Sequence, residues 1–75
     1  MNKARREALQ KISATLEQLQ SDIECMRDDE QEYSDNMPEN LQSSEKHDTA
    51  ENAVNSMDDA IISIVEAVSS IEEIE

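Results

Sequence analysis

Apolar residues return at alternating intervals of three and four positions along two long stretches of this chain. The first stretch contains Leu9, Ile12, Leu16, Leu19, Ile23 and Met26, followed seven positions later by Tyr33. The second contains Ala50, Val54, Met57, Ile61, Ile64, Val68 and Ile71. Residues three and four positions apart lie on the same side of an α-helix. The pattern therefore predicts two amphipathic helices whose apolar stripes face each other.

A single proline separates the two stretches, and the chain contains no glycine. Pro38 cannot continue a helix, and it also moves Met37 out of the helical region. Without glycine, tight β-hairpin turns lose their usual residue, so we expect the fold class to be all-α. The expected fold is an antiparallel, coiled-coil-like two-helix hairpin that forms one domain over residues 1–75. We expect helices at about 3–34 and about 44–74, with a loop at 35–43.

The start of the second helix has two solutions in the sequence. Ser43 or Ser44 can cap it, because a serine hydroxyl accepts a hydrogen bond from the first free N–H groups of a helix. Alternatively, the segment Asp48-Thr49-Ala50-Glu51 has the spacing of a capping box, which would begin the helix four residues later.

The apolar face of the second helix is wider than one neighbouring helix can cover. Its stripe is flanked on one side by Ala53, Ala60, Ala67 and Ile74 and on the other by Ile62 and Val65. We therefore expect a second copy of the chain to cover the remainder and form a four-helix bundle. The residues assigned to this self-association are Ala53, Ala60, Ile61, Ile62, Ile64, Val65, Ala67 and Val68.

The charge of the chain is strongly negative, at −13, and unevenly distributed. Residues 1–11 carry a net charge of +3, whereas the other 64 residues carry −16. Such a field repels nucleic acid and anionic membranes and attracts basic protein surfaces. An antiparallel hairpin would also bring the basic start of the chain beside its acidic end, where we expect ion pairs. The residues concerned are Lys3, Arg5 and Arg6 at one end and Glu72, Glu73 and Glu75 at the other.

The densest acidic cluster lies at the end of the first helix, and it lacks the glycine and the alternating ligands of a calcium loop. Two interpretations stay open: a solvated helix end, or a docking surface for a basic partner protein. In the second interpretation, Tyr33 and Met37 add an aromatic and an apolar contact at the tip of the loop. The acidic residues assigned to partner binding are Asp28, Asp29, Glu30, Glu32, Asp35, Asp58, Asp59 and Glu66.

The sequence contains no pattern of residues typical of catalysis or metal binding. His47 is the only histidine, and Cys25 is the only cysteine and has no base beside it. We therefore expect no enzymatic activity, no cofactor and no metal site.

A single cysteine favours a reducing compartment, and no stretch approaches the roughly 18 apolar residues of a membrane span. The expected location is the cytoplasm.

The loop segment Asp35-Asn36-Met37-Pro38-Glu39-Asn40-Leu41-Gln42-Ser43-Ser44-Glu45 resembles that of short, acidic, uncharacterised helical-hairpin proteins of bacteriophages and other bacterial mobile elements. In that family, blocks of an acidic residue, alanine and isoleucine follow the turn. Similar blocks here are Met57-Asp58-Asp59-Ala60-Ile61 and Val65-Glu66-Ala67-Val68. The likeness covers nearly the whole chain, although Ser and Asn occupy positions 55, 56, 63, 69 and 70, where Glu and Ala are expected. The resemblance implies a mobile-element origin and a bacterial host, but no activity.

Two functions fit these features. The first is an inhibitor of the DNA-mimic or anti-defence type (an anti-CRISPR protein, for example), which occupies a basic, nucleic-acid-binding surface of a host protein. The second is a non-enzymatic structural or adaptor homodimer, in which the acidity only confers solubility. Neither function involves direct binding of nucleic acid or of a membrane.

Overall fold

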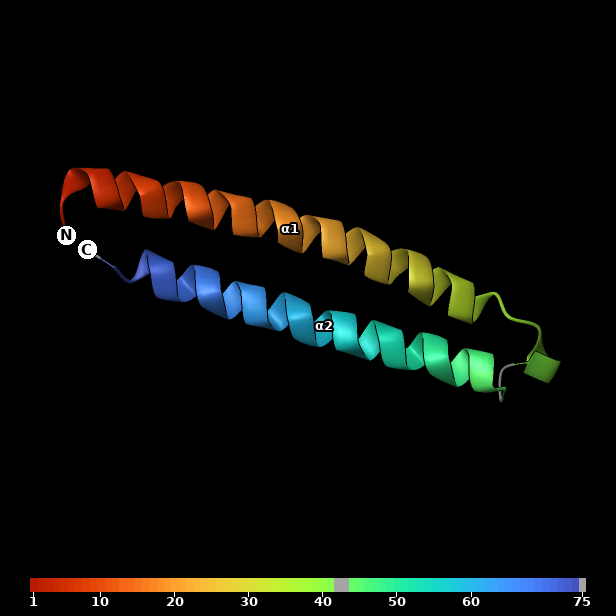
Figure 1. The fold of residues 1–75 in the computed structure, drawn as a ribbon. Helices are drawn as coiled ribbons and strands as arrows, with labels where there is room; N and C mark the ends of the chain where they lie inside the picture. The colour runs from red at the N-terminus through yellow and green to blue at the C-terminus, as the bar shows by residue number, and fades with distance from the viewer. Residues whose placement is uncertain (42–43, 75) are drawn as a thin grey trace.

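The computed structural model describes residues 1–41 and 44–74, which form two long helices joined at one end (Figure 1). Helix α1 covers Lys3–Asp35, and helix α2 covers Glu45–Glu72. A short 3-10 turn, η1, covers Glu39–Leu41 between them. The helices run antiparallel and side by side in a rod of 59 × 14 × 12 Å, with both chain ends at the same end of the rod. The expected all-α hairpin is confirmed.

Helix α1 begins and ends with local hydrogen bonds that need no glycine. At its start, the N–H of Arg5 donates to the side-chain Oδ1 of Asn2 at 2.8 Å. At its end, the N–H of Asn36 donates to the carbonyl oxygen of Glu32 at 3.0 Å. Asn36 has a φ of −88°, and no residue in the described ranges has a positive φ. Pro38 follows two positions later and prevents the helix from continuing.

Helix α2 begins after Ser44. The N–H of His47 donates to the hydroxyl oxygen of Ser44 at 3.3 Å, which is the geometry of an N-cap. Of the two starts that the sequence left open, the structure therefore has the earlier one, and Asp48 lies inside the first turn of the helix. Ser43 lies outside the described residues.

The apolar stripe of α2 lies against α1, as its spacing predicts. The buried members of this stripe are Ala50, Val54, Ile61 and Val68. The half-buried members are Met57, Ile64 and Ile71. Met37, which is 8% exposed, closes the core at the loop end of the hairpin. These residues form a thin aliphatic core that runs along the rod.

The apolar stripe of α1 is only partly where its spacing predicts. Every second member faces outward, at 50% exposure for Ile12, 48% for Leu19, 63% for Met26 and 53% for Tyr33. The positions that lie against α2 are instead Leu9, Ser13, Leu16, Gln20, Ile23, Arg27, Glu30 and Ser34. The prediction of a continuous apolar stripe on the inner face of α1 is therefore wrong. Because every other member of the stripe stays at the interface and the rest are replaced by the next residue, helix α1 is rotated about its axis by roughly half a residue position, or about 50°.

Polar contacts to α2 account for this rotation of α1. Arg27 and Ser34 both reach carboxylates of α2, which they could not do from the outer face of α1. Ser13, a small residue, is also buried on the side of α1 that faces α2. Satisfied polar groups and close packing thus replace large apolar side chains on this half of the interface.

The ion pairs expected between the two ends of the chain are not found among the described residues. Lys3 instead pairs with Glu7 one turn further along α1, at 4.0 Å. Arg6 donates from Nη2 to the carbonyl oxygen of Met1 at 3.0 Å. Exposed pairs of this kind contribute little, so local partners compete easily with partners on the other helix. Glu75, the last residue of the expected set, lies outside the described part of the chain.

Candidate interaction surfaces

Arg27 joins the two helices at the middle of the rod. Its Nη1 lies 3.1 Å from Oδ1 of Asp58 on α2, and its Nη2 lies 3.0 Å from Oδ1 of Asp28 on α1. The hydrogen bonds to Asp58 and then to Asp28 raise the pKa of Arg27 above its ordinary value, so the guanidinium stays charged. Two of the acids assigned to partner binding are therefore already paired within the hairpin.

A second polar contact joins the helices near the loop. The hydroxyl of Ser34, which is 0% exposed, donates to Oε1 of Glu51 on α2 at 2.6 Å. Nε2 of His47 lies 3.7 Å from the same oxygen. The three residue types are those of a hydrolase triad, but the carboxylate lies between the other two groups and the serine is enclosed. The arrangement is a structural link between helices.

The polar contacts and the shallow hollows together define one acidic side of the rod. Glu51 and Asp58 receive the two bonds from α1, and Glu72 lies two heptads after Asp58 on the same side of α2. On α1, Glu17 lines one hollow with Glu72 and another with Val65, and Glu24 follows Glu17 by seven residues. We call this surface, made by Glu17, Glu24, Glu51, Asp58 and Glu72, the acidic side.

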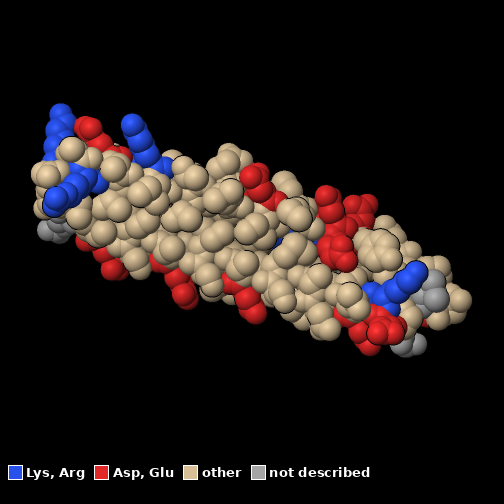
Figure 2. Space-filling model, viewed as in Figure 1, with Lys and Arg blue, Asp and Glu red and all other residues tan. Residues whose placement is uncertain are grey.

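A row of carboxylates follows the outer edge of α2. Asp59, Glu66 and Glu73 are seven residues apart and exposed, and the described residues offer them no ion pair. In Figure 2, acidic atoms recur along the lower edge of the rod, which is the α2 edge in Figure 1. We call these three residues the outer row. It adjoins the acidic side and includes two of the acids that were assigned to partner binding.

The remaining acids of the predicted set lie near the loop and have different surroundings. Asp35 accepts a hydrogen bond from Nε2 of Gln31 at 2.9 Å, and Glu30 is half-buried toward α2. Asp29 and Glu32 are exposed and line a hollow at the loop end. The structure thus does not bring the eight predicted acids together on one surface.

The hollow at the loop end is the place predicted for a docking tip. It is lined by Asp29, Glu32, Tyr33, Asn36, Met37, Pro38 and Lys46. Tyr33 is half exposed there, whereas Met37 is buried beneath it. Met37 is therefore a core residue that lines the floor of the hollow, and Tyr33 provides more of its accessible surface.

The residues assigned to self-association are divided among three surroundings. Ile61 and Val68 are buried against α1, and Ile64 is half-buried, so these three are not free to meet a second copy. Ile62 and Val65 are exposed at 55% and 43%, and Val65 lies beside Glu17 on the acidic side. The alanines, Ala53, Ala60 and Ala67, follow a separate line at seven-residue intervals.

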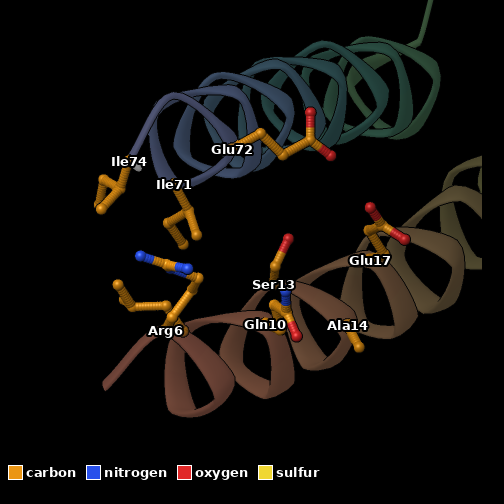
Figure 3. A pocket seen from close by; sticks show the side chains of 9 residues that line it. Arg6, Gln10, Ser13, Ala14, Glu17, Ile71, Glu72 and Ile74 are labelled. Atoms are coloured by element: carbon orange, nitrogen blue, oxygen red, sulfur yellow. The ribbon is translucent and has the colours of Figure 1, made fainter. Parts of the chain in front are cut away.

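A further hollow lies where the chain ends meet (Figure 3). Arg6 extends from α1 toward Ile71 and Ile74, while the carboxylates of Glu17 and Glu72 lie further along the helices. The hollow is open and combines one guanidinium with apolar side chains. The expected pair between Arg6 and Glu72 is not formed in it.

The described residues contain no group of three or more His, Cys, Asp or Glu side chains able to hold a metal ion. Cys25 is exposed on α1 as a free thiol. Across residues 1–41 and 44–74, neither helix has a sufficiently apolar segment to span a bilayer.

Comparisons with protein families, with curated proteins and with solved structures find no match to this chain.

Proposed function

We propose that this chain is a non-enzymatic binding protein that docks its acidic side and outer row on a basic surface of another protein, in competition with nucleic acid. The single observation that carries the proposal is the separation of charge around the rod. In Figure 2, acidic atoms lie along the edges of the rod, including the outer edge of α2, whereas residues other than Lys, Arg, Asp and Glu occupy the middle of the visible face.

The density of charge is comparable with that of a nucleic acid strand. A net charge of −13 along 59 Å corresponds to about one negative charge per 4.5 Å, against about one per 3.4 Å along one DNA strand. Rigid helices hold these charges in fixed positions, so a partner does not need to order them on binding. This value is an average over the whole rod; within the outer row the carboxylates are seven residues, or about 10 Å, apart, so a basic groove that follows a phosphate backbone would meet a sparser row of fixed anions.

The carboxylates differ in how available they are. Asp59 and Glu66 are exposed and free of ion pairs within the described residues, and they lie seven positions apart. Asp28 and Asp58 already share the charge of Arg27. We therefore place the main contacts on the outer row and on Glu17 and Glu72 of the adjoining acidic side, rather than on the paired Asp28 and Asp58.

The mobile-element resemblance adds the setting of this proposal. The partner would be a nucleic-acid-binding protein in the cytoplasm of a bacterial host, such as a defence nuclease or a repair enzyme. Association through long-range charge should be fast and should weaken steeply with added salt.

The experiment is capture of bacterial proteins on the immobilised chain, followed by competition. We expect duplex DNA or RNA to release the captured protein, and the free chain to displace nucleic acid from it. A double variant, Asp59→Asn with Glu66→Gln, should lose capture while retaining the helical circular dichroism of the wild type. The matched control is Asp22→Asn with Asp29→Asn, which removes the same charge from exposed positions away from the outer row.

Equal loss of capture in the two double variants would mean that only net charge matters. If the captured protein binds the chain and nucleic acid at the same time, the mimicry is wrong and the adaptor function takes its place.

A further inference from the structure

Four large side chains form an exposed line along α1. Ile12, Leu19, Met26 and Tyr33 are seven residues apart, and each is about half exposed. Residues at this interval return to nearly the same side of a helix, with a drift of about 20° per heptad. Single exposed apolar residues are common on protein surfaces, but a continuous line along a whole helix indicates a contact surface. We call these four residues the apolar row.

The surface of the apolar row continues from α1 onto α2. Tyr33, at one end of the apolar row, shares two hollows with Lys46 of α2, and acidic residues line the rims of both hollows. Ala53, Ala60 and Ala67 follow Lys46 at intervals of seven, so they lie on the same side of α2 as Lys46. The acidic side lies on the opposite side of the rod, where Arg27 and Ser34 make their bonds to α2.

The size of this face suits a specific protein interface. The rod is 59 Å long and 14 Å wide, so one face offers on the order of 800 Å². A stable interface of standard size buries about 800 Å² on each partner. A two-helix hairpin of 75 residues buries few side chains completely, so covering this face would add substantially to its apolar core.

The distribution of charge along the rod indicates what can cover the face. Residues 1–11 carry a net charge of +3, and residues 28–48 hold eight acidic residues against Lys46, a net of −7. A second copy in the same direction would place two acidic loop ends together. A second copy in the opposite direction places each basic start beside the acidic loop end of the other copy.

We propose that two copies of this chain pack face to face in opposite directions through the apolar row. The row is symmetric about its midpoint, so Ile12 of each copy lies over Tyr33 of the other, and Leu19 lies over Met26. The small side chains of the alanine line let the two α2 helices approach on the same face. Both acidic sides and both outer rows then point outward, so this inference is independent of the proposed partner binding.

The first experiment measures the oligomeric state by sedimentation. The wild type should be a dimer at micromolar concentration. Leu19→Asp should raise the dimer dissociation constant at least about 100-fold, because a symmetric interface receives the charge twice. The matched control is Ile62→Asp, which places the same charge at an exposed apolar position beside the acidic side and should leave the dimer intact.

The second experiment tests the direction of packing without a destabilising charge. In a Cys25→Ser background, Ile12→Cys and Tyr33→Cys variants are prepared separately and mixed under mild oxidation. Opposite directions predict a disulfide between the two different variants in the mixture and little cross-linking of either variant alone. A dimer in the same direction would instead cross-link each variant to itself.

Three results would overturn the proposal. One is a wild type that stays monomeric at high micromolar concentration, and another is efficient cross-linking of Ile12→Cys to itself. The third is a dimer that Ile62→Asp dissociates and Leu19→Asp does not, since the contact would then lie on the opposite side of the rod. If Leu19→Asp loses its helical structure, the cross-linking experiment still decides the proposal, because it does not use that variant.

Discussion

Helix α2 and helix α1 carry apolar residues at the same spacing, yet they present different residues to each other. The buried positions of α2 are apolar, whereas those of α1 are Ser13 and Ser34. On α2, apolar side chains flank the stripe on both sides, so a small rotation still turns an apolar residue toward α1. On α1, polar residues border the stripe, and the rotation replaces Ile12 with Ser13 at the interface. Spacing therefore identifies a helix more securely than it identifies the face that meets a partner.

The largest effect should come from a charge in the core of α2. Ile61 is 9% exposed, and Ile61→Asp places an unpaired carboxylate among apolar side chains. We expect a loss of about 4 kcal/mol or more in the free energy of unfolding, which is enough to unfold a domain of this size. Thermal denaturation followed by circular dichroism measures it.

The adjacent substitution Ile62→Asp is the control, because Ile62 is 55% exposed, and it should cost under about 1 kcal/mol. Equal losses at the two positions would show that α2 does not use one buried face.

A smaller effect should come from the buried polar contact of α1. Ser34→Ala removes the hydroxyl that donates to Glu51 and should cost about 1–2 kcal/mol, because the carboxylate loses a bond inside the interface. Urea denaturation provides the free energy of unfolding. Ser21→Ala, at an exposed position of the same helix, should change it little. A Ser34→Ala variant as stable as the wild type would mean that this bond does not hold α1 in its rotation.

The comparison between the helices becomes sharper if α1 is made more like α2. Gln20 is half-buried and lines a hollow with Val65 and Val68. Gln20→Leu should stabilise the hairpin by about 1 kcal/mol, since apolar area replaces a polar side chain against these residues. The midpoint of urea denaturation should rise, with little change in slope. A decrease would indicate that the bond from Gln20 to Glu24 matters more than apolar burial.

The smallest effect should come from salt. With 19 acidic and six basic residues, like charges repel along the rod, and added sodium chloride should raise the melting temperature by a few degrees. Mild acidification toward the isoelectric point near 4.1 should act in the same direction until solubility fails. A melting temperature that falls steadily with salt would instead show that the pairs of Arg27 outweigh the repulsion.

Much of the surface chemistry could not be predicted from spacing alone. Asp28, Asp58 and Asp59 look alike in the sequence, but the first two share Arg27 and the third is unpaired. Met37 was expected as a contact at the loop tip, yet it is only 8% exposed. The apolar row was also missed, because the same four residues were assigned to the core. The sequence feature that could have revealed this row is the residue after each of its members, Ser13, Gln20 and Arg27, because these three are the residues that lie against α2.

The sequence by itself determined the two helices, the loop around Pro38 and the antiparallel arrangement. These features depend on residues close together in the chain, where backbone geometry and local hydrogen bonds leave few alternatives. The rotation of α1 was decided only by the tertiary structure. It depends on contacts between residues far apart in the chain, such as Arg27 with Asp58 and Ser34 with Glu51. Several rotations of an amphipathic helix bury similar apolar areas, so a few specific polar contacts can select among them.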